Sequence, residues 1–339
     1  MHDVITVGSA TQDVFLRSSK FQHIEDKDKL EDIGFGESKA ECFALGTKME
    51  MEEMNLEYGG GAVNAAISFS KRDLKTKTLT KVGEDCFGDN IVDYLDEQGI
   101  NVEVIRDDKN ITGYSNILLM PNGARTVLVH RGAAEKISKG SIDIDKLKAH
   151  WFYISPSEMP YSTAEWLLKK LSKREKTVKT AMNPSQYYLD RGLKKLKPIF
   201  SKLDVLIMNK EEASYLTNVD YTAETRKMLR KLNKYTDAVV VVTEGAKGSS
   251  ASDGRYIYEA GTYDEEEVVD RTGAGDAFGA GFVAGLIKEG DIPYAIKLAT
   301  ANATSVIESV GAHTGALGVK NFERRDQFEY LDLDIEPLV

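Results

Sequence analysis

The sequence has few of the residues that build disulfide frameworks and metal clusters. Its 339 residues include two cysteines, Cys42 and Cys86, which lie far apart and have no spacing typical of metal ligands. Five histidines are equally scattered. We therefore expect neither structural disulfides nor a tightly bound transition metal.

Long apolar runs and positively charged tracts are missing as well. No segment approaches the ~20 apolar residues that a membrane helix needs, and residues 1–8 have the pattern of a buried strand rather than of a signal peptide. Lysine and arginine number 44 against 54 acidic residues, a net charge of −10. These features disfavour membranes and nucleic acids as partners and predict a cytoplasmic protein.

What the sequence does contain is an alternation of short apolar runs with helical patterns, which is typical of an α/β fold with a mostly parallel sheet covered on both faces. A hydrophobic content of 42% is enough for a sizeable core. The predicted strands are 4–7, 78–82, 151–154, 177–182, 205–208 and 238–243. The predicted helices are 62–72, 85–98, 163–172, 210–216, 223–232, 275–288 and 292–309.

One long segment, 17–58, breaks this alternation, being charged and lacking a clear helical period. It contains an alternating apolar pattern at 42–51, which suggests a strand. A second extended pair, 113–120 and 125–130, is joined by residues 121–124, whose Asn-Gly sequence is a strong hairpin signal. Together these segments predict a small β-sheet that projects from the main domain, although an ordinary decorated edge would fit the same pattern.

The stretch 268–282 carries the strongest chemical signal. Gly273, Ala274 and Gly275 have almost no side chain, so the N–H groups at the start of the following helix can approach a phosphate closely. Asp276, in the first helical turn, is placed to take a proton from a hydroxyl that attacks a phosphoryl group. A tight turn with an acid that stabilises the helix dipole is the alternative for a Gly-x-Gly taken alone.

A second glycine-rich stretch lies at 58–66. Gly60 and Gly61 precede a predicted helix and let the backbone pass close to a ligand, and Asn64 offers a donor and an acceptor to a hydroxyl. Asp13 follows the first predicted strand, at the end of a sheet where ligands of α/β proteins bind. The residues before Asp13 lack the Gly-x-Gly-x-x-Gly turn of dinucleotide-binding proteins, which disfavours an oxidoreductase.

Four motifs occur in order along the chain, at 59–64, 83–88, 209–212 and 270–278, and they resemble the signatures of the ribokinase-like (PfkB) family of carbohydrate and nucleoside kinases. The resemblance implies one three-layer αβα domain over 1–339. It also implies a β-sheet lid built from about 14–58 and 111–131, which covers the substrate and pairs two chains in a homodimer. Arg271 departs from the small residue usual at its position.

The resemblance assigns roles to further residues. Glu212 would organise Mg²⁺ through water, and Asp270, with the loop 311–312, is a candidate site for a monovalent cation such as K⁺. Asn302 would face the adenine base of ATP. The residues that would contact the nucleotide are Asn183, Asn209, Thr243, Gly245, Gly248 and Asn302. A helix cap would explain Asn209 and Glu212 equally well.

The expected function is ATP- and Mg²⁺-dependent transfer of a phosphoryl group to the hydroxymethyl group of a small sugar, with Asp276 as general base. Residues 44–54 and 155–158 would select the acceptor, and their mixture of charged and apolar side chains leaves a nucleoside kinase as the alternative. A catalytically silent regulator that binds a sugar or a nucleotide is a third possibility, against which the intact Asp276 argues.

Overall fold

The computed structural model describes residues 1–34, 39–120, 125–174, 178–263, 268–324 and 331–338. Within them, a ten-stranded sheet has the order β16-β15-β14-β13-β12-β11-β10-β1-β6-β7. Its strands are β1 (His2–Gly8), β6 (Thr76–Gly83), β7 (Asn101–Asp107), β10 (Ala149–Ser155), β11 (Lys179–Met182), β12 (Val205–Asn209), β13 (Val239–Thr243), β14 (Ser249–Ser252), β15 (Tyr256–Ala260) and β16 (Leu333–Pro337). The strands from β13 to β7 are parallel, and β14, β15 and β16 form an antiparallel edge.

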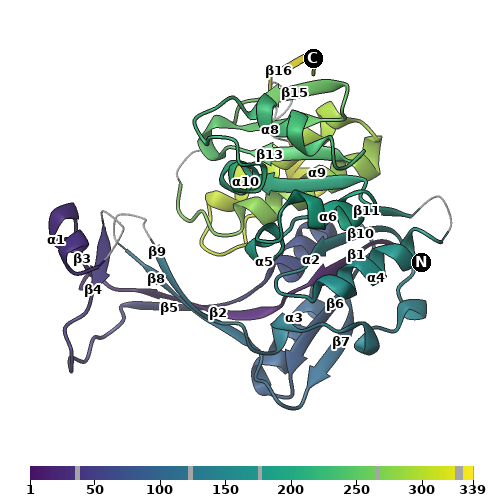
Figure 1. The fold of residues 1–339 in the computed structure, drawn as a ribbon. Helices are drawn as coiled ribbons and strands as arrows, with labels where there is room; N and C mark the ends of the chain where they lie inside the picture. Colours follow the sequence, from purple (N-terminus) through teal and green to yellow (C-terminus); the bar gives the residue numbers. More distant parts are fainter. Residues whose placement is uncertain (35–38, 121–124, 175–177, 264–267, 325–330, 339) are drawn as a thin grey trace.

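Helices cover both faces of this sheet (Figure 1). One layer contains α4 (Tyr161–Leu171), α5 (Gln186–Leu189), α6 (Leu193–Phe200), α7 (Lys210–Thr217) and α8 (Thr225–Leu232). The other contains α2 (Gly61–Lys71), α9 (Ala274–Glu289) and α10 (Ile292–Ile307), with α3 (Cys86–Glu97) packed beside α2. On β12, Leu206 and Met208 face the first layer and Ile207 faces the second, as the alternation of side chains along a strand requires. The predicted three-layer α/β architecture is confirmed.

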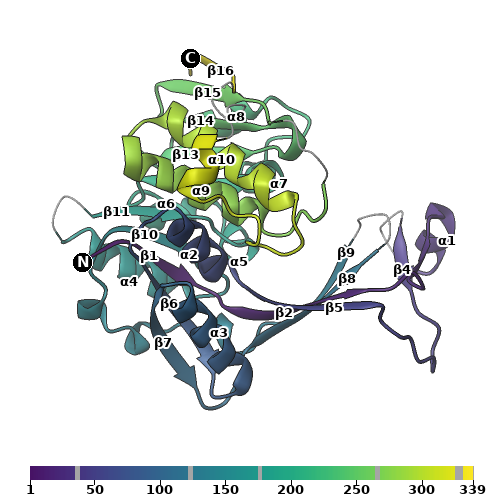
Figure 2. The same ribbon diagram turned by 180° about the vertical axis from the view of Figure 1, so that it is seen from behind.

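A separate sheet has the order β5-β2-β8-β9 and projects from the main body (Figures 1 and 2). It consists of β2 (Thr11–Arg17), β5 (Glu53–Gly59), β8 (Gly113–Leu119) and β9 (Arg125–His130). The strands β8 and β9 pair antiparallel, as the hairpin signal predicts, while its Asn-Gly turn at 121–124 lies outside the described residues. At the far end, β3 (Gln22–Ile24) pairs with β4 (Ala40–Cys42), next to α1 (Lys27–Asp32).

One expectation for this region is wrong. Residues 43–52 form no strand, although their apolar pattern alternates, because Met49 and Met51 pack against Phe21 and Leu118 instead of pairing with a neighbouring strand. Asp13 follows β1, as expected, and lies within β2 of the small sheet. The chain leaves β1 at Gly8 and enters the small sheet only three residues later.

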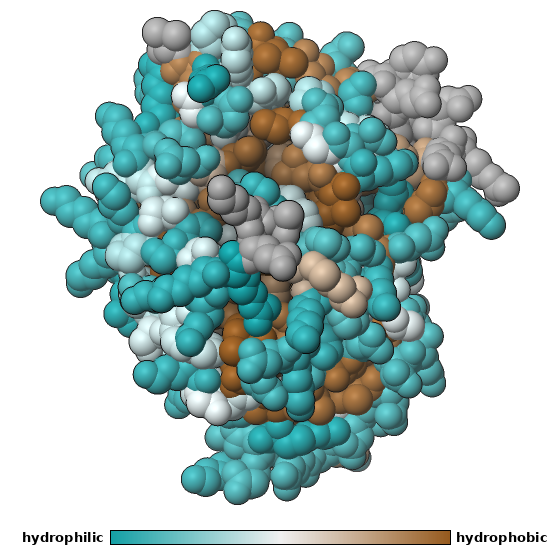
Figure 3. Space-filling model, turned by 90° about the vertical axis from the view of Figure 1, so that its right-hand side faces the viewer, coloured by the Kyte–Doolittle hydropathy of each residue, from teal (hydrophilic) through white to brown (hydrophobic). Residues whose placement is uncertain are grey.

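The rest of the described chain includes α11 (Val319–Arg324). No helix in the described ranges is long and apolar enough to span a membrane. The face turned away from the small sheet is mostly hydrophilic, with apolar side chains gathered between the charged ones (Figure 3).

Candidate active site

The start of α9 has the geometry expected of an anion site, here called the anion turn (273–275). Gly273 precedes the helix with φ +78°, and a Cβ there would lie 2.1 Å from the carbonyl oxygen of Ala312. Only glycine fits this conformation and this contact without strain. No side chain caps the helix. Its first N–H groups, which have no intrahelical partner, therefore remain available to an anion.

Asp276 meets the start of α2 at this point. Its Oδ2 accepts a hydrogen bond from Asn64 Nδ2 at 2.9 Å. A Cβ on Gly61 would lie 2.0 Å from Ser155 Oγ and 3.4 Å from Asp276 Oδ1, and Gly60 has φ +95°. The structure thus brings the two glycine-rich stretches together, and their glycines allow the backbone to approach the carboxylate.

The surroundings of Asp276 favour a proton acceptor with a shifted pKa. Burial raises the pKa of its carboxyl group, and the hydrogen bond from Asn64 lowers the same pKa in part. Two buried polar atoms nearby, Asn64 Oδ1 and the Tyr153 hydroxyl, have no hydrogen-bond partner. Unpaired buried polar atoms are costly, so their presence beside Asp276 indicates a place where a polar ligand or water binds.

Asp13 borders the same region from the small sheet. Its Oδ1 accepts a hydrogen bond from Ser115 Oγ on β8, and a Cβ on Gly59 would lie 1.9 Å from its Oδ2. Burial raises the pKa of Asp13. It also raises the pKa of the half-buried Glu57, which lies opposite Asp13 on the neighbouring strand β5. The sheet therefore presents two partly desolvated carboxyl groups, of which sequence reasoning identified only Asp13.

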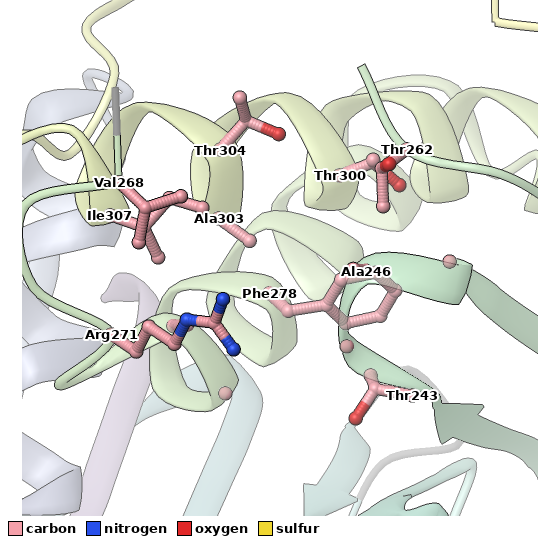
Figure 4. A pocket seen from close by; sticks show the side chains of 14 residues that line it. Thr243, Ala246, Thr262, Val268, Arg271, Phe278, Thr300, Ala303, Thr304 and Ile307 are labelled. Carbon is pink, nitrogen blue, oxygen red and sulfur yellow. The ribbon is translucent and has the colours of Figure 1, made fainter. Parts of the chain in front are cut away.

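A cavity of about 250 Å³ opens beside the anion site (Figure 4). The predicted residues Thr243, Gly245 and Gly248 line it, as do Ala274 and Gly275 of the anion turn. The other lining residues are Ala246, Thr262, Val268, Arg271, Phe278, Thr300, Ala303, Thr304 and Ile307. Thr300, Ala303, Thr304 and Ile307 recur at the spacing of one helix face on α10, a signal that could have identified them from the sequence.

Asn302 does not line this cavity, so the expectation that it faces a base is wrong. Its Nδ2 donates to the carbonyl of Ala277 at 2.8 Å, and its Oδ1 accepts from the N–H of Leu317 at 2.8 Å. The side chain is buried between α10, α9 and the segment that follows α10. Both ends of the amide are engaged, so Asn302 joins these elements and leaves the cavity to its helical neighbours Ala303 and Thr300.

The Asn209–Glu212 motif forms the capping box that was the alternative to a ligand site. Asn209 Oδ1 accepts from the N–H of Glu212 at 2.8 Å, and Glu212 Oε2 accepts from the N–H of Asn209 at 2.9 Å. Burial nevertheless raises the pKa of Glu212, and the negative charge of Asp276 raises this pKa further. Asn183 follows β11 and donates to the carbonyl of Ile207 at 3.0 Å.

Two other motif carboxylates hold loops in place. Asp270 accepts from the N–H and Oγ1 of Thr272 at 2.9 and 2.7 Å, and from the N–H of Gly311 at 3.2 Å. Asp85 caps α3 through the N–H of Gly88 and accepts two hydrogen bonds from Thr112. Asp270 and Gly311 thus lie together, as expected, while Asp85 of the 83–88 motif caps α3 and holds Thr112. Among the described residues, no group of three or more metal-ligating side chains occurs.

Comparisons with known proteins agree with this geometry. Residues 1–317 match the family described as pfkB family carbohydrate kinase. A cytidine kinase from Thermococcus kodakarensis is 29% identical over 260 residues, 75% of this chain and 88% of that protein. A deoxyribokinase from Salmonella typhi is 26% identical over 303 residues, 85% of this chain and 92% of that protein.

Among solved structures, Arabidopsis thaliana ribokinase complexed with ribose and ATP has a TM-score of 0.78 at 20% identity, over 97% of this chain and 99% of that chain. This chain therefore belongs to the pfkB family of carbohydrate kinases, and it is a phosphotransferase that acts on a hydroxyl group of a sugar or a nucleoside.

Proposed function

We propose that the protein transfers the γ-phosphoryl group of ATP to a hydroxymethyl group of a small sugar, with Asp276 as the general base. One observation carries the proposal: the Asp276 carboxylate, held by Asn64, lies at the uncapped start of α9, between the cavity and the glycine-rich start of α2. An acceptor hydroxyl beside Asp276 would lose its proton as it attacks a phosphoryl group held by the helix N-terminus.

Other groups of the chain would stabilise the moving phosphoryl group and bind the acceptor. The backbone N–H groups at Gly273, Ala274 and Gly275 would stabilise the negative charge of the moving phosphoryl group. Asp13 and Asn64, with the backbone at 60–61, would hold the hydroxyls of the acceptor. Asn64 Oδ1 supports this role, since it is buried and still lacks a hydrogen-bond donor.

The cavity supports ATP as the donor. Its lining combines the apolar side chains of Phe278 and Ile307 with threonine hydroxyls, and it includes Ala274 and Gly275 at the start of α9. Such a lining suits a ligand that has both an apolar base and phosphates. The ribokinase of Arabidopsis thaliana, which shares the fold, was solved with ATP and ribose.

Mg²⁺ fits the residues present. Glu212 is partly buried, its pKa is raised by burial and by neighbouring acids, and one of its oxygens stays outside the capping box. A cation beside it would relieve this unfavourable charge. Glu212 would hold Mg²⁺ through water, and the ion would neutralise charge on the nucleotide phosphates. For K⁺, Asp270 and the backbone at 311–312 remain the candidate site.

A sugar is favoured over a nucleoside by the polarity around Asp13. Ser115 and Glu57 lie beside it, and carboxylates and hydroxyls suit a polyol better than an apolar base. The cytidine kinase among the relatives keeps nucleosides as the alternative. Nothing in the site favours a silent regulator.

The small sheet would act as a lid over the acceptor and as the interface of a homodimer, within one kinase domain that spans 1–339. Its strand β2 carries Asp13, whose carboxylate lies against Gly59, two residues before the Gly61 backbone that approaches Asp276. Closure of such a lid would exclude water and limit wasteful hydrolysis of ATP.

The proposal is tested by measuring ADP release with Mg-ATP and a panel of acceptors: D-ribose, D-fructose, 2-keto-3-deoxygluconate, adenosine, cytidine and guanosine. We expect turnover on a sugar that is lost in Asp276→Asn. Turnover only on nucleosides would establish the alternative. Binding of ATP without turnover on any acceptor would contradict the assignment of these sugars as substrates.

A further inference from the structure

Arg271 stands immediately before the anion turn, at a position where the family motif has a small residue. It is the only charged side chain among the described residues that line the cavity, whose other members are threonine, glycine, alanine and apolar residues. Figure 4 shows its guanidinium group directed into the cavity, on the same side as the start of α9. The departure from the motif therefore places a permanent positive charge inside the site.

This charge has no partner in the described part of the chain. Among the described residues, no ion pair or hydrogen bond engages the Arg271 side chain. The adjacent carboxylate, Asp270, is buried, and its oxygens accept hydrogen bonds from Thr272 and Gly311. An arginine that faces a cavity without a counter-ion is complementary to an anionic ligand.

The chemistry of the surrounding groups identifies the kind of anion. A guanidinium group presents a planar fork of N–H donors that matches phosphate oxygens, and the backbone at Ala274 and Gly275 borders the same cavity with its own N–H donors. Two independent sets of donors thus converge on one space. A carboxylate could use one of them, whereas a chain of phosphates can use both.

We propose that Arg271 binds the phosphate groups of the nucleotide donor. This inference rests on the proposed kinase function and adds a donor-specific residue to it. Arg271 lines the donor cavity, whereas Asp276 does not, so Arg271 acts on donor affinity and takes no part in removing the proton from the acceptor. Its replacement should change the KM for ATP far more than the KM for the acceptor.

The test compares ADP binding, measured by calorimetry with Mg²⁺ at several NaCl concentrations, in wild type, Arg271→Met, Arg271→Lys and Lys247→Met. Lys247 is an exposed lysine at the end of the 245–247 turn that does not line the cavity, so its replacement removes the same charge nearby. We expect Arg271→Met to weaken ADP binding about tenfold to a hundredfold, as the loss of charged hydrogen bonds does, and to reduce its salt dependence. Arg271→Lys should recover part of the affinity, and Lys247→Met should resemble wild type.

Three results would overturn the inference: unchanged ADP affinity in Arg271→Met, a loss of affinity with unchanged salt dependence, or an equal loss in Lys247→Met. The first would mean that the charge is unused, the second that packing is responsible, and the third that only the general field matters. A failure of ATP as the proposed donor is separate, because wild type itself would then bind no ADP, and an error in the proposed acceptor would leave this comparison of ADP affinities unaffected. Melting temperatures of the variants check that each is folded.

Discussion

Asp276 has two properties expected of a general base: it lies in the first turn of α9, whose start no side chain caps, and burial disfavours its ionised form. Asp276→Asn keeps the size of the side chain and an oxygen that can accept from Asn64. We expect turnover to fall by about 10²- to 10⁴-fold, the usual contribution of a general base. Asparagine carries no charge, so the variant avoids the cost of burying the Asp276 carboxylate. Its melting temperature at neutral pH should therefore rise by a few degrees.

Calorimetric ATP binding and thermal melts of Asp276→Asn test this combination. Unchanged ATP affinity with lost turnover is the expected pattern. A lower melting temperature together with lost activity would mean that Asp276 supports the fold, and would count against its role as base.

Asn64 tunes the carboxylate that it contacts. Its amide donates to the ionised Asp276 and so lowers the pKa that burial raises. In Asn64→Leu the donor is missing, and the carboxyl pKa should rise further. The base must be ionised, so the acid limb of the pH profile of kcat should move to higher pH. If the acid limb of Asn64→Leu stays at the wild-type pH while the KM for the acceptor rises, then Asn64 binds the acceptor and does not set the pKa of Asp276.

At the scale of elements, regular periodicity explains which parts the sequence could predict. The seven predicted helices are present within about two residues of their predicted ends, because each has an apolar face to bury. The strands β14 to β16 were missed, since Ser249–Ser252 carries no run of apolar residues and acquires its place by pairing with β13. The strand propensity of residues 249–252 could not show that this segment pairs with β13.

The direction in which a side chain points from a correctly predicted helix was harder to predict from the sequence. Both Asn302 and Thr304 lie on the predicted helix α10, but only Thr304 lines the cavity. The small residues around Asn302 allow close packing and ligand contact alike, and the hydrogen bonds with Ala277 and Leu317 decide between them. Similarly, the four letters at 209–212 fit a cap and a cation site, and the structure shows that the cap forms.

The loop that follows α10 is joined to the small sheet by His313. Its Nε2–H donates to the carbonyl of Tyr58 on β5 at 2.7 Å, and its ring stacks on Tyr94. The side chain is 2% exposed, and burial lowers its pKa to about 4, helped by the charge of Lys71 and opposed by the bond to Tyr58. The native structure therefore holds a neutral histidine.

Protonation of His313 should destabilise the fold below its unfolded pKa of about 6.5. The unfolded state binds the proton first, so the stabilisation is complete above that pH and is lost as the pH falls toward 4. Between about pH 7 and about pH 5 we expect this group to lower the free energy of unfolding by about 2 kcal/mol.

Urea unfolding of wild type and His313→Gln at both pH values measures this contribution. Buried carboxyl groups with raised pKa values, such as those of Asp13 and Glu57, act in the opposite direction but are common to both proteins. The variant should therefore lose less stability on acidification. Equal losses would exclude His313 as the source.

At the scale of the whole molecule, the small sheet has two faces with different surroundings. Asp13 and Ser115 point toward the site, in register with Val129. The opposite face carries Leu56 and Leu128, which are 60% and 55% exposed. The face of Asp13 also carries an exposed apolar side chain, Val129, which is 52% exposed. Exposed apolar side chains on a projecting sheet are typical of a protein interface.

We expect this outer face to pair two chains, and charge placed on it to separate them. In a twofold interface each residue occurs twice, so Leu56→Lys and Leu128→Lys together introduce four charges into one apolar contact. Light scattering should give wild type the mass of two 37.6 kDa chains and the double variant that of one. Val129→Lys, on the face that carries Asp13, is the matched control and should stay dimeric with an altered KM for the acceptor. Four lysine charges could not be buried together without a large loss of affinity, so a double variant that remains dimeric would show that the outer face is not the interface. A wild type with the mass of one chain would equally show that this face serves another purpose.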